Sequence, residues 1–125
     1  MQSLLLVMAG GAIGAGARHL TGAAMLRALG PGWPWGTLTV NLLGGFLMGA
    51  LIGWLAQQSD GGNNLRLLLG VGMLGGFTTF SAFSLDVVLM IERGEVWPAG
   101  GYVLASVVGS IVALMVGLSL MRTAA

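Results

Sequence analysis

The sequence is poor in charged residues. Only 7% of its 125 residues are Asp, Glu, Lys or Arg, whereas about one-quarter of a typical soluble domain is charged. So few charges cannot cover a surface that faces water, and 56% of the residues are hydrophobic. The net charge of +1 also lacks the basic excess that binding to nucleic acid requires. These numbers indicate an integral membrane protein.

Cysteine is absent, and histidine occurs once, as His19. Without cysteine, neither a disulfide framework nor thiol chemistry is possible. We expect Asp60, Glu92 and Glu95 in turns and Asp86 near the end of an apolar run, so no nucleophile–base pair or metal-ligand spacing is visible. The sequence therefore predicts that the chain is not an enzyme, and His19 is interpreted as an interfacial histidine.

Long uncharged runs fill most of the chain. A bilayer-spanning helix needs about 20 residues, so four spans nearly exhaust the length and make one all-α transmembrane domain over residues 1–125. We expect the spans at about 3–26, 36–56, 65–91 and 97–121. The segments 29–36, 57–64 and 92–96 are the expected turns, with Trp33 and Trp35 at the membrane interface. This arrangement places both termini on one side.

The first apolar run has an alternative interpretation. A secretory signal peptide cleaved at Ala15-Gly16-Ala17 would have a similar length. Such peptides normally carry Lys or Arg before the apolar run, and none is present here. We therefore favour a first span over a signal peptide.

The arginines give no clear orientation. Arg66 and Arg122 are expected on the side of the termini, whereas Arg27 and Arg93, with Arg18 if it lies near that end, are expected on the opposite side. A chain without a preferred orientation can insert both ways and pair with an inverted copy of itself. We therefore predict an antiparallel dual-topology homodimer, although a near-tie also arises by chance when charges are few.

Small residues recur every four positions on two spans. Such stripes allow helices to pack closely but do not identify the partner helix. They comprise Gly45, Gly49 and Gly53 on the second span, and Ala105, Gly109, Ala113 and Gly117 on the fourth.

Polar side chains without charge lie inside two spans. Asn41, in the second, must face another helix or an aqueous path, because an amide in hydrocarbon needs hydrogen-bond partners. Tyr102, Ser106 and Ser110 recur every four residues on the fourth span and share one face. They either bond to their own helix or line a path, and the stripe stops at Leu114.

The third span has a weak centre. Gly75-Gly76 is followed by Thr78-Thr79, and we expect the helix to break there. Broken backbone is tolerated in a membrane only where it is buried in protein or lines a cavity, and freed carbonyls can coordinate a cation. Phe80 and Phe83, three residues apart, share a face if the helix resumes.

Three stretches of the chain resemble one known family. GGAIGAGARH (10–19), GTLTVNLLGGFLMG (36–49) and GMLGGFTTFSAFS (72–84) are similar to the signature regions of the Fluc (CrcB) fluoride-channel family. The resemblance covers the whole chain in length and span count. It implies a dual-topology homodimer with two pores that passively exports cytoplasmic fluoride across a cell membrane, as expected of a prokaryotic inner membrane.

The resemblance also implies roles for individual residues. A fluoride pathway would include Asn41, the ring edges of Phe80 and Phe83, and the polar track of Tyr102, Ser106 and Ser110, with Thr79 and Ser81 in the pore region. Arg18 would lie at a vestibule. The backbone carbonyls of Gly75 and Thr78 would bind a structural sodium ion (Na+) at the dimer interface.

Two other classes of function are weighed against this one. A small dimeric four-helix exporter of cationic drugs shares the size and pairing, but relies on an intramembrane carboxylate. The first span has no carboxylate, and Asp86 is expected too near the end of the third span to substitute for one. A membrane scaffold without transport activity would explain the glycine stripes and leave the polar break unexplained.

Overall fold

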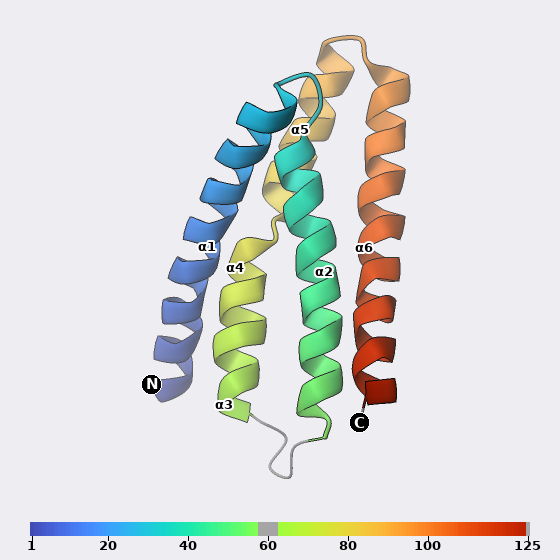
Figure 1. Cartoon of the computed structure of the whole chain (residues 1–125). Coiled ribbons are helices and arrows are strands. Elements are labelled where there is room, and N and C mark those ends of the chain that lie inside the picture. Colours follow the sequence, from blue (N-terminus) through green and yellow to red (C-terminus); the bar gives the residue numbers. More distant parts are fainter. Residues whose placement is uncertain (58–62, 125) are drawn as a thin grey trace.

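The computed structural model describes residues 1–57 and 63–124, and every regular element in these ranges is a helix. Four helical segments are long and apolar enough to cross a membrane: Gln2–Leu29, Trp35–Leu55, Asn63–Glu92 and Val96–Thr123. They run alternately up and down, so both termini lie at the same end of the bundle (Figure 1). The prediction of four all-helical spans is confirmed. Asp60 lies outside the described residues.

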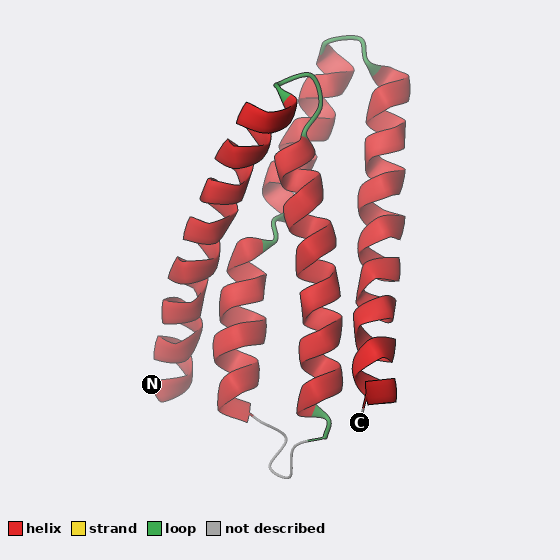
Figure 2. Ribbon diagram, in the orientation of Figure 1, coloured by secondary structure: helices red, strands yellow, loops and turns green. Residues whose placement is uncertain are grey.

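Three of the spans are single helices. They are α1 (Gln2–Leu29), α2 (Trp35–Leu55) and α6 (Val96–Ala124). The third span is divided into α3 (Asn63–Leu65), the π-helix η1 (Arg66–Leu74), α4 (Gly75–Phe77) and α5 (Phe80–Glu92). Figure 2 shows the loop that separates α4 from α5 midway along the span.

The break in the third span falls on the two threonines. Gly75 has helical backbone angles (φ −63°, ψ −39°), whereas Thr78 (φ −84°, ψ 158°) and Thr79 (φ −151°, ψ 126°) are extended. The expectation that the glycine pair belongs to the break was therefore wrong in this detail. A β-branched residue adopts extended backbone readily. Gly76 serves close packing instead, because a Cβ there would lie 2.6 Å from the carbonyl oxygen of Gly11.

The two small-residue stripes pack against each other within one chain. A Cβ added to Gly45 of α2 would lie 2.7 Å from the carbonyl oxygen of Ser110, and one added to Gly117 of α6 would lie 2.9 Å from the nitrogen of Ala50. Side-chain carbons do not approach backbone that closely. The glycines thus bring α2 and α6 into backbone contact, and this fixes which face of α6 points toward α2.

A second glycine seam joins α1 to the first half of the third span. A Cβ on Gly14 would lie 2.8 Å from the nitrogen of Phe77, and one on Gly72 would lie 2.9 Å from the Cα of Gly10. Close helix approach of this kind is typical of membrane proteins, where small residues replace a hydrophobic driving force. The seam holds η1 and α4 against α1.

The buried apolar core lies at the end opposite the termini. Leu38, Phe83, Met90, Ala99 and Tyr102 form one cluster there, and Trp33 packs on it. Trp33 is therefore partly inside the protein, with its ring 5.5 Å from that of Tyr102. Trp97, 90% exposed at the start of α6, is placed as an interfacial anchor would be.

Candidate functional site

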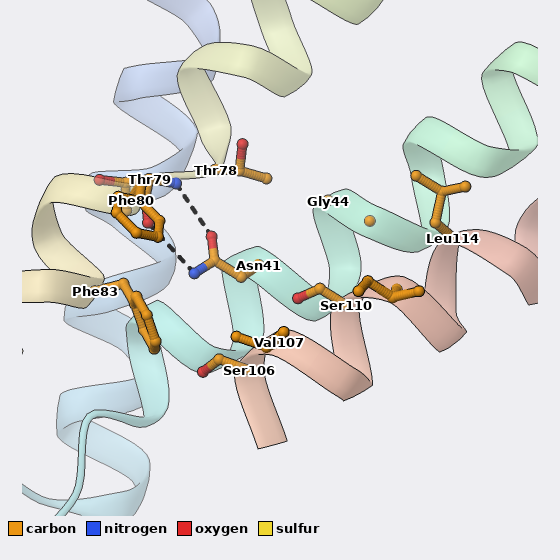
Figure 3. Close-up of a pocket in the computed structure, with 12 residues that line it drawn as sticks. Asn41, Gly44, Thr78, Thr79, Phe80, Phe83, Ser106, Val107, Ser110 and Leu114 are labelled. Carbon is orange, nitrogen blue, oxygen red and sulfur yellow. Dashed lines mark hydrogen bonds between the residues drawn. The ribbon is translucent and has the colours of Figure 1, made fainter. Parts of the chain in front are cut away.

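A cavity of about 400 Å³ lies against the break, between α2, α5 and α6 (Figure 3). Its lining consists of Asn41, Gly44 and Gly45 of α2, Thr78 and Thr79 of the break, Phe80 and Phe83 of α5, and Ser106, Val107, Ser110, Ile111 and Leu114 of α6. Most of the predicted pathway residues thus meet at one place although they come from distant parts of the chain. None of the residues in this lining carries a charge.

Asn41 bridges α2 to the broken backbone. Its Oδ1 accepts a hydrogen bond from the Thr79 N–H (3.1 Å), and its Nδ2 donates to the Thr79 carbonyl oxygen (3.4 Å), as Figure 3 shows. These are main-chain groups that an unbroken helix would have paired internally. Asn41 therefore stabilises the break and also lines the cavity, so the two interpretations of this residue do not exclude each other.

The threonine hydroxyls are also used by the backbone. The Thr78 Oγ1 donates to the Leu74 carbonyl oxygen at 3.0 Å. The Thr79 Oγ1 accepts from the Ala82 N–H at 3.1 Å and so caps the N-terminus of α5. Ser81, which is exposed, lies 3.3 Å from the same hydroxyl and is not in the cavity lining. Thr79 is thus held at its amide, its carbonyl and its side chain.

Phe80 and Phe83 present one exposed and one buried ring to the cavity. Their ring centroids are 5.7 Å apart with planes tilted by 47°. Phe80 is 77% exposed, whereas Phe83 is 8% exposed and packs 5.2 Å from the ring of Tyr102. An aromatic ring has a positive edge and a negative face. At this separation the two rings contact each other, so a ligand in the cavity would lie beside the pair and not between the rings.

Ser106 is a buried hydroxyl without a partner. It is 5% exposed, and its Oγ makes no hydrogen bond within the described part of the chain. Ser110 lies one turn further along α6 in the same lining, followed by Ile111 and Leu114. Burying an unsatisfied hydroxyl is unfavourable, so such groups in native proteins call for an explanation. Ser106 belongs to the lining of the cavity.

Tyr102 lies behind this lining and not in it. Its side chain is fully buried, and its hydroxyl donates to Oδ2 of Asp86 at 3.0 Å. Asp86 lines a second cavity of about 310 Å³, together with Thr37 and Arg93. Sequence reasoning did not place Asp86 at a site. The only signal was a carboxylate within an apolar segment, since the pairing of residues 86 and 102 is tertiary.

Arg18 reaches the break from α1. Its Nε donates to the Gly76 carbonyl oxygen at 3.2 Å. With His19, Thr37 and Thr79 it also lines a third cavity of about 340 Å³. This cavity and the one at the break both include Thr79 in their linings.

Gly75 is exposed, and the break releases its carbonyl from its helical partner. In a continuous helix the Thr79 N–H would bond to the Gly75 carbonyl oxygen, but here it donates to Asn41. The last carbonyls of any helix lack such partners. The Gly75 carbonyl oxygen therefore lacks the amide donor that a continuous helix would supply. The structure brings every predicted site residue to the break or to the face of α6 beside it.

Four apolar spans, a broken helix and an uncharged cavity with polar and aromatic groups at the break define a class of membrane protein. Non-helical backbone within a membrane is found where it is buried in protein or lines a pathway for small ions or molecules. The chain is an integral membrane protein with such a site.

Comparison with known proteins identifies the family. The family model described as "CrcB-like protein, Camphor Resistance (CrcB)" matches residues 5–118, and the chain belongs to this family. A protein of Sphingopyxis alaskensis is 58% identical over 122 residues, covering 98% of this chain and 97% of its own. One of Chelativorans sp. is 61% identical over 123 residues, covering 98% of each chain. Both are named "Fluoride-specific ion channel FluC". The resemblance predicted from the three motifs is confirmed.

Proposed function

We propose that the chain is a passive, fluoride-selective channel that exports cytoplasmic fluoride, and not an enzyme. The relatives at more than half identity carry the name of a fluoride-specific ion channel. Within the structure, the observation that carries the proposal is the buried, unpaired Ser106 hydroxyl beside Asn41 and the two phenylalanine rings. The Ser106 Oγ makes no hydrogen bond within the described part of the chain.

The lining suits a small, strongly hydrated anion. Fluoride is a strong hydrogen-bond acceptor, so a dry pathway must replace its water with donors. Ser106 and Ser110 supply hydroxyls, and Asn41 has a second N–H besides the one bonded to Thr79. The edges of Phe80 and Phe83 favour an anion without supplying a fixed charge. A larger, less basic anion such as chloride gains less from these donors.

The test is ion efflux from liposomes. Purified protein is reconstituted, the vesicles are loaded with fluoride, and its release is followed with an ion-selective electrode after the potential is clamped. We expect fluoride to leave down its gradient without a coupled ion, and chloride to stay inside. No fluoride release, or equal release of chloride, would overturn the proposal.

We further propose that the working unit is an antiparallel homodimer in a prokaryotic inner membrane. Gly75, Phe80 and Ser81 are exposed at the break, which lies at the middle of the third span. Polar groups of a broken helix are poorly tolerated against lipid, so this face needs protein to cover it. Arg18 lies at the break, so it counts toward neither side of the membrane. Each side then has two arginines, Arg27 and Arg93 on one and Arg66 and Arg122 on the other. A balanced count permits insertion in both orientations.

The absence of cysteine makes this topology easy to test. The variant Thr123→Cys carries the only thiol, at an exposed position near the end of α6. Intact cells are treated with a membrane-impermeant maleimide, and the labelled fraction is compared with that after permeabilisation. Without a charge bias, roughly half of the thiols should be labelled from outside. Labelling of nearly all or none would show a single orientation.

We also propose a structural sodium ion at the dimer interface, held by the Gly75 and Thr78 carbonyls of both copies. The exposed position of Gly75 and the loss of its helical partner support this assignment. Sodium bound there would offset the carbonyl dipoles of two broken helices and add a positive field for the anion pathway. We expect replacement of sodium by a bulky organic cation to weaken dimer assembly, measured by size-exclusion chromatography, and to stop efflux. Intact assembly and efflux would argue against the ion.

The 340 Å³ cavity that Arg18 and His19 line is our candidate for the aqueous vestibule. Its lining shares Thr79 with that of the cavity at the break. A positive charge at its base would raise the local concentration of an anion. The drug-exporter alternative is not favoured, because the cavity at the break contains no carboxylate and Asp86 is bonded to Tyr102 near the end of its span.

A further inference from the structure

Arg18 takes the place of a missing backbone donor. The Gly76 carbonyl belongs to the last turn before the break, where the next residues of an unbroken helix would supply an N–H group. The guanidinium Nε–H of Arg18 donates to this oxygen at 3.2 Å in a partly buried contact. Arg18 therefore binds the break from α1, whereas Asn41 binds it from α2.

Helix packing determines where Arg18 lies. Gly14, one turn earlier on α1, packs so closely that a Cβ would lie 2.8 Å from the nitrogen of Phe77. Gly76 in turn faces Gly11, whose carbonyl oxygen would lie 2.6 Å from a Cβ at residue 76. Because neither surface carries side chains, the guanidinium reaches a main-chain oxygen of α4 directly. The contact follows from the glycine seam between the two segments.

The held carbonyl is next to one that the cation site uses. The peptide groups of Gly75 and Gly76 are joined at the Cα of Gly76, where the lack of a Cβ leaves the backbone angles least restricted. Both residues lie in the last helical turn before the break, so a bond that holds the Gly76 carbonyl also limits movement of the neighbouring Gly75 carbonyl. Arg18 makes that bond, and Asn41 fixes Thr79 on the far side of the break.

We propose that Arg18 is a positioning residue whose Nε–H caps the first half of the broken span and thereby orients the Gly75 carbonyl for the cation. The role of that cation rests on the proposed function. This role is distinct from attraction of an anion into the vestibule, because it depends on the hydrogen-bond donor at Nε. The positive charge of the guanidinium group is not required for this role.

Three substitutions separate the donor from the charge. Arg18→Gln removes the charge but keeps an N–H donor, since the glutamine Nε2 is separated from Cα by the same number of bonds as the arginine Nε. Arg18→Lys keeps the charge and moves the donor beyond that point. Arg18→Met removes both at similar length. Arg27→Gln, at an exposed position in the last turn of α1, is the matched control for loss of one positive charge.

Amide hydrogen exchange over residues 75–82, measured by mass spectrometry on purified protein in sodium, reports how firmly the break is held. We expect exchange at least about tenfold faster in Arg18→Met, because the hydrogen bond to the Gly76 carbonyl oxygen is lost. Arg18→Lys should resemble it, whereas Arg18→Gln and Arg27→Gln should resemble the wild type. The sodium concentration for half-maximal dimer assembly should rise in the same two variants.

Three results would overturn the inference. The first is amide exchange in Arg18→Met at the wild-type rate. The second is exchange in Arg18→Lys as slow as that in Arg18→Gln. The third is exchange in Arg27→Gln as fast as that in Arg18→Met. Failure of the wild-type protein to release fluoride would instead overturn the proposed function. The exchange measurement requires no ion flux, so it decides the role of Arg18 independently.

Discussion

Replacing Ser106 by alanine should make the protein more stable and less active. The Ser106 hydroxyl is buried, and no group in the described part of the chain satisfies it. An unsatisfied buried polar group costs about 1–3 kcal/mol, and alanine removes the oxygen while it leaves the backbone and most of the packing unchanged. After allowance for the contacts of the lost atom, we expect a gain of about 1 kcal/mol in the free energy of unfolding.

Fluoride flux should change in the opposite direction. A hydrogen bond to an ion contributes about 1.5–3 kcal/mol, and 1.4 kcal/mol corresponds to a tenfold change in an equilibrium or a rate. Loss of the Ser106 donor should therefore slow fluoride release by about tenfold or more. A residue that only packs would not combine higher stability with lower flux.

The assays are reversible unfolding in mixed detergent micelles and efflux from liposomes. Ser119→Ala, at an exposed position on the same helix and outside the cavity lining, is the matched control and should change neither quantity. A loss of stability in Ser106→Ala would show that the hydroxyl has a structural partner. Unchanged flux would show that the ion does not use it. Either result refutes the reasoning.

Further substitutions probe the other parts of the site. Phe83→Ile should slow efflux and lower the free energy of unfolding by about 1–2 kcal/mol, because the ring is only 8% exposed. Phe80→Ile should also slow efflux, but with little change in the free energy of unfolding of the monomer. Equal flux in the wild type and both variants would show that the rings serve packing alone. Asn41→Leu leaves the Thr79 amide and carbonyl unpaired and should cost about 2–5 kcal/mol in the unfolding assay, so a loss below 1 kcal/mol would contradict its bridging role. Gly45→Ala forces α2 away from the Ser110 carbonyl and should lower the free energy of unfolding by about 1–3 kcal/mol. Gly16→Ala, which has open space around it, should raise the free energy of unfolding by about 0.5–1 kcal/mol. A change of the same sign in both variants would refute the close-packing argument.

The spans were predictable from the sequence because long uncharged runs leave few alternatives. The pairing of the glycine stripes was not, since small residues every four positions show that a helix is packed closely but not against which neighbour. In the structure Gly45 meets the backbone at Ser110, so the partner is the fourth span of the same chain. Such pairings depend on which faces remain after all helices have packed.

The break was predicted at the right place in the chain but for an incomplete reason. Glycine is a poor helix former in water, so Gly75 and Gly76 suggested the break. In the structure both are helical, and a Cβ at Gly76 would collide with α1. Packing overrides propensity there. Of the two extended residues, Thr79 finds side-chain partners for both of its backbone groups in Asn41.

The polar residues at the break divide into two groups by what their hydrogen-bonding atoms do. Asn41, Thr79 and Arg18 each bond to backbone atoms of the break or of the adjoining helix ends, and they are needed whether or not an ion passes. The Ser106 hydroxyl makes no such bond among residues 1–57 and 63–124. For stability alone, an apolar residue at position 106 would be better than serine. The Ser106 donor, which shares an uncharged lining with Phe80 and Phe83, is therefore the feature that folding does not explain and that passage of a small anion does.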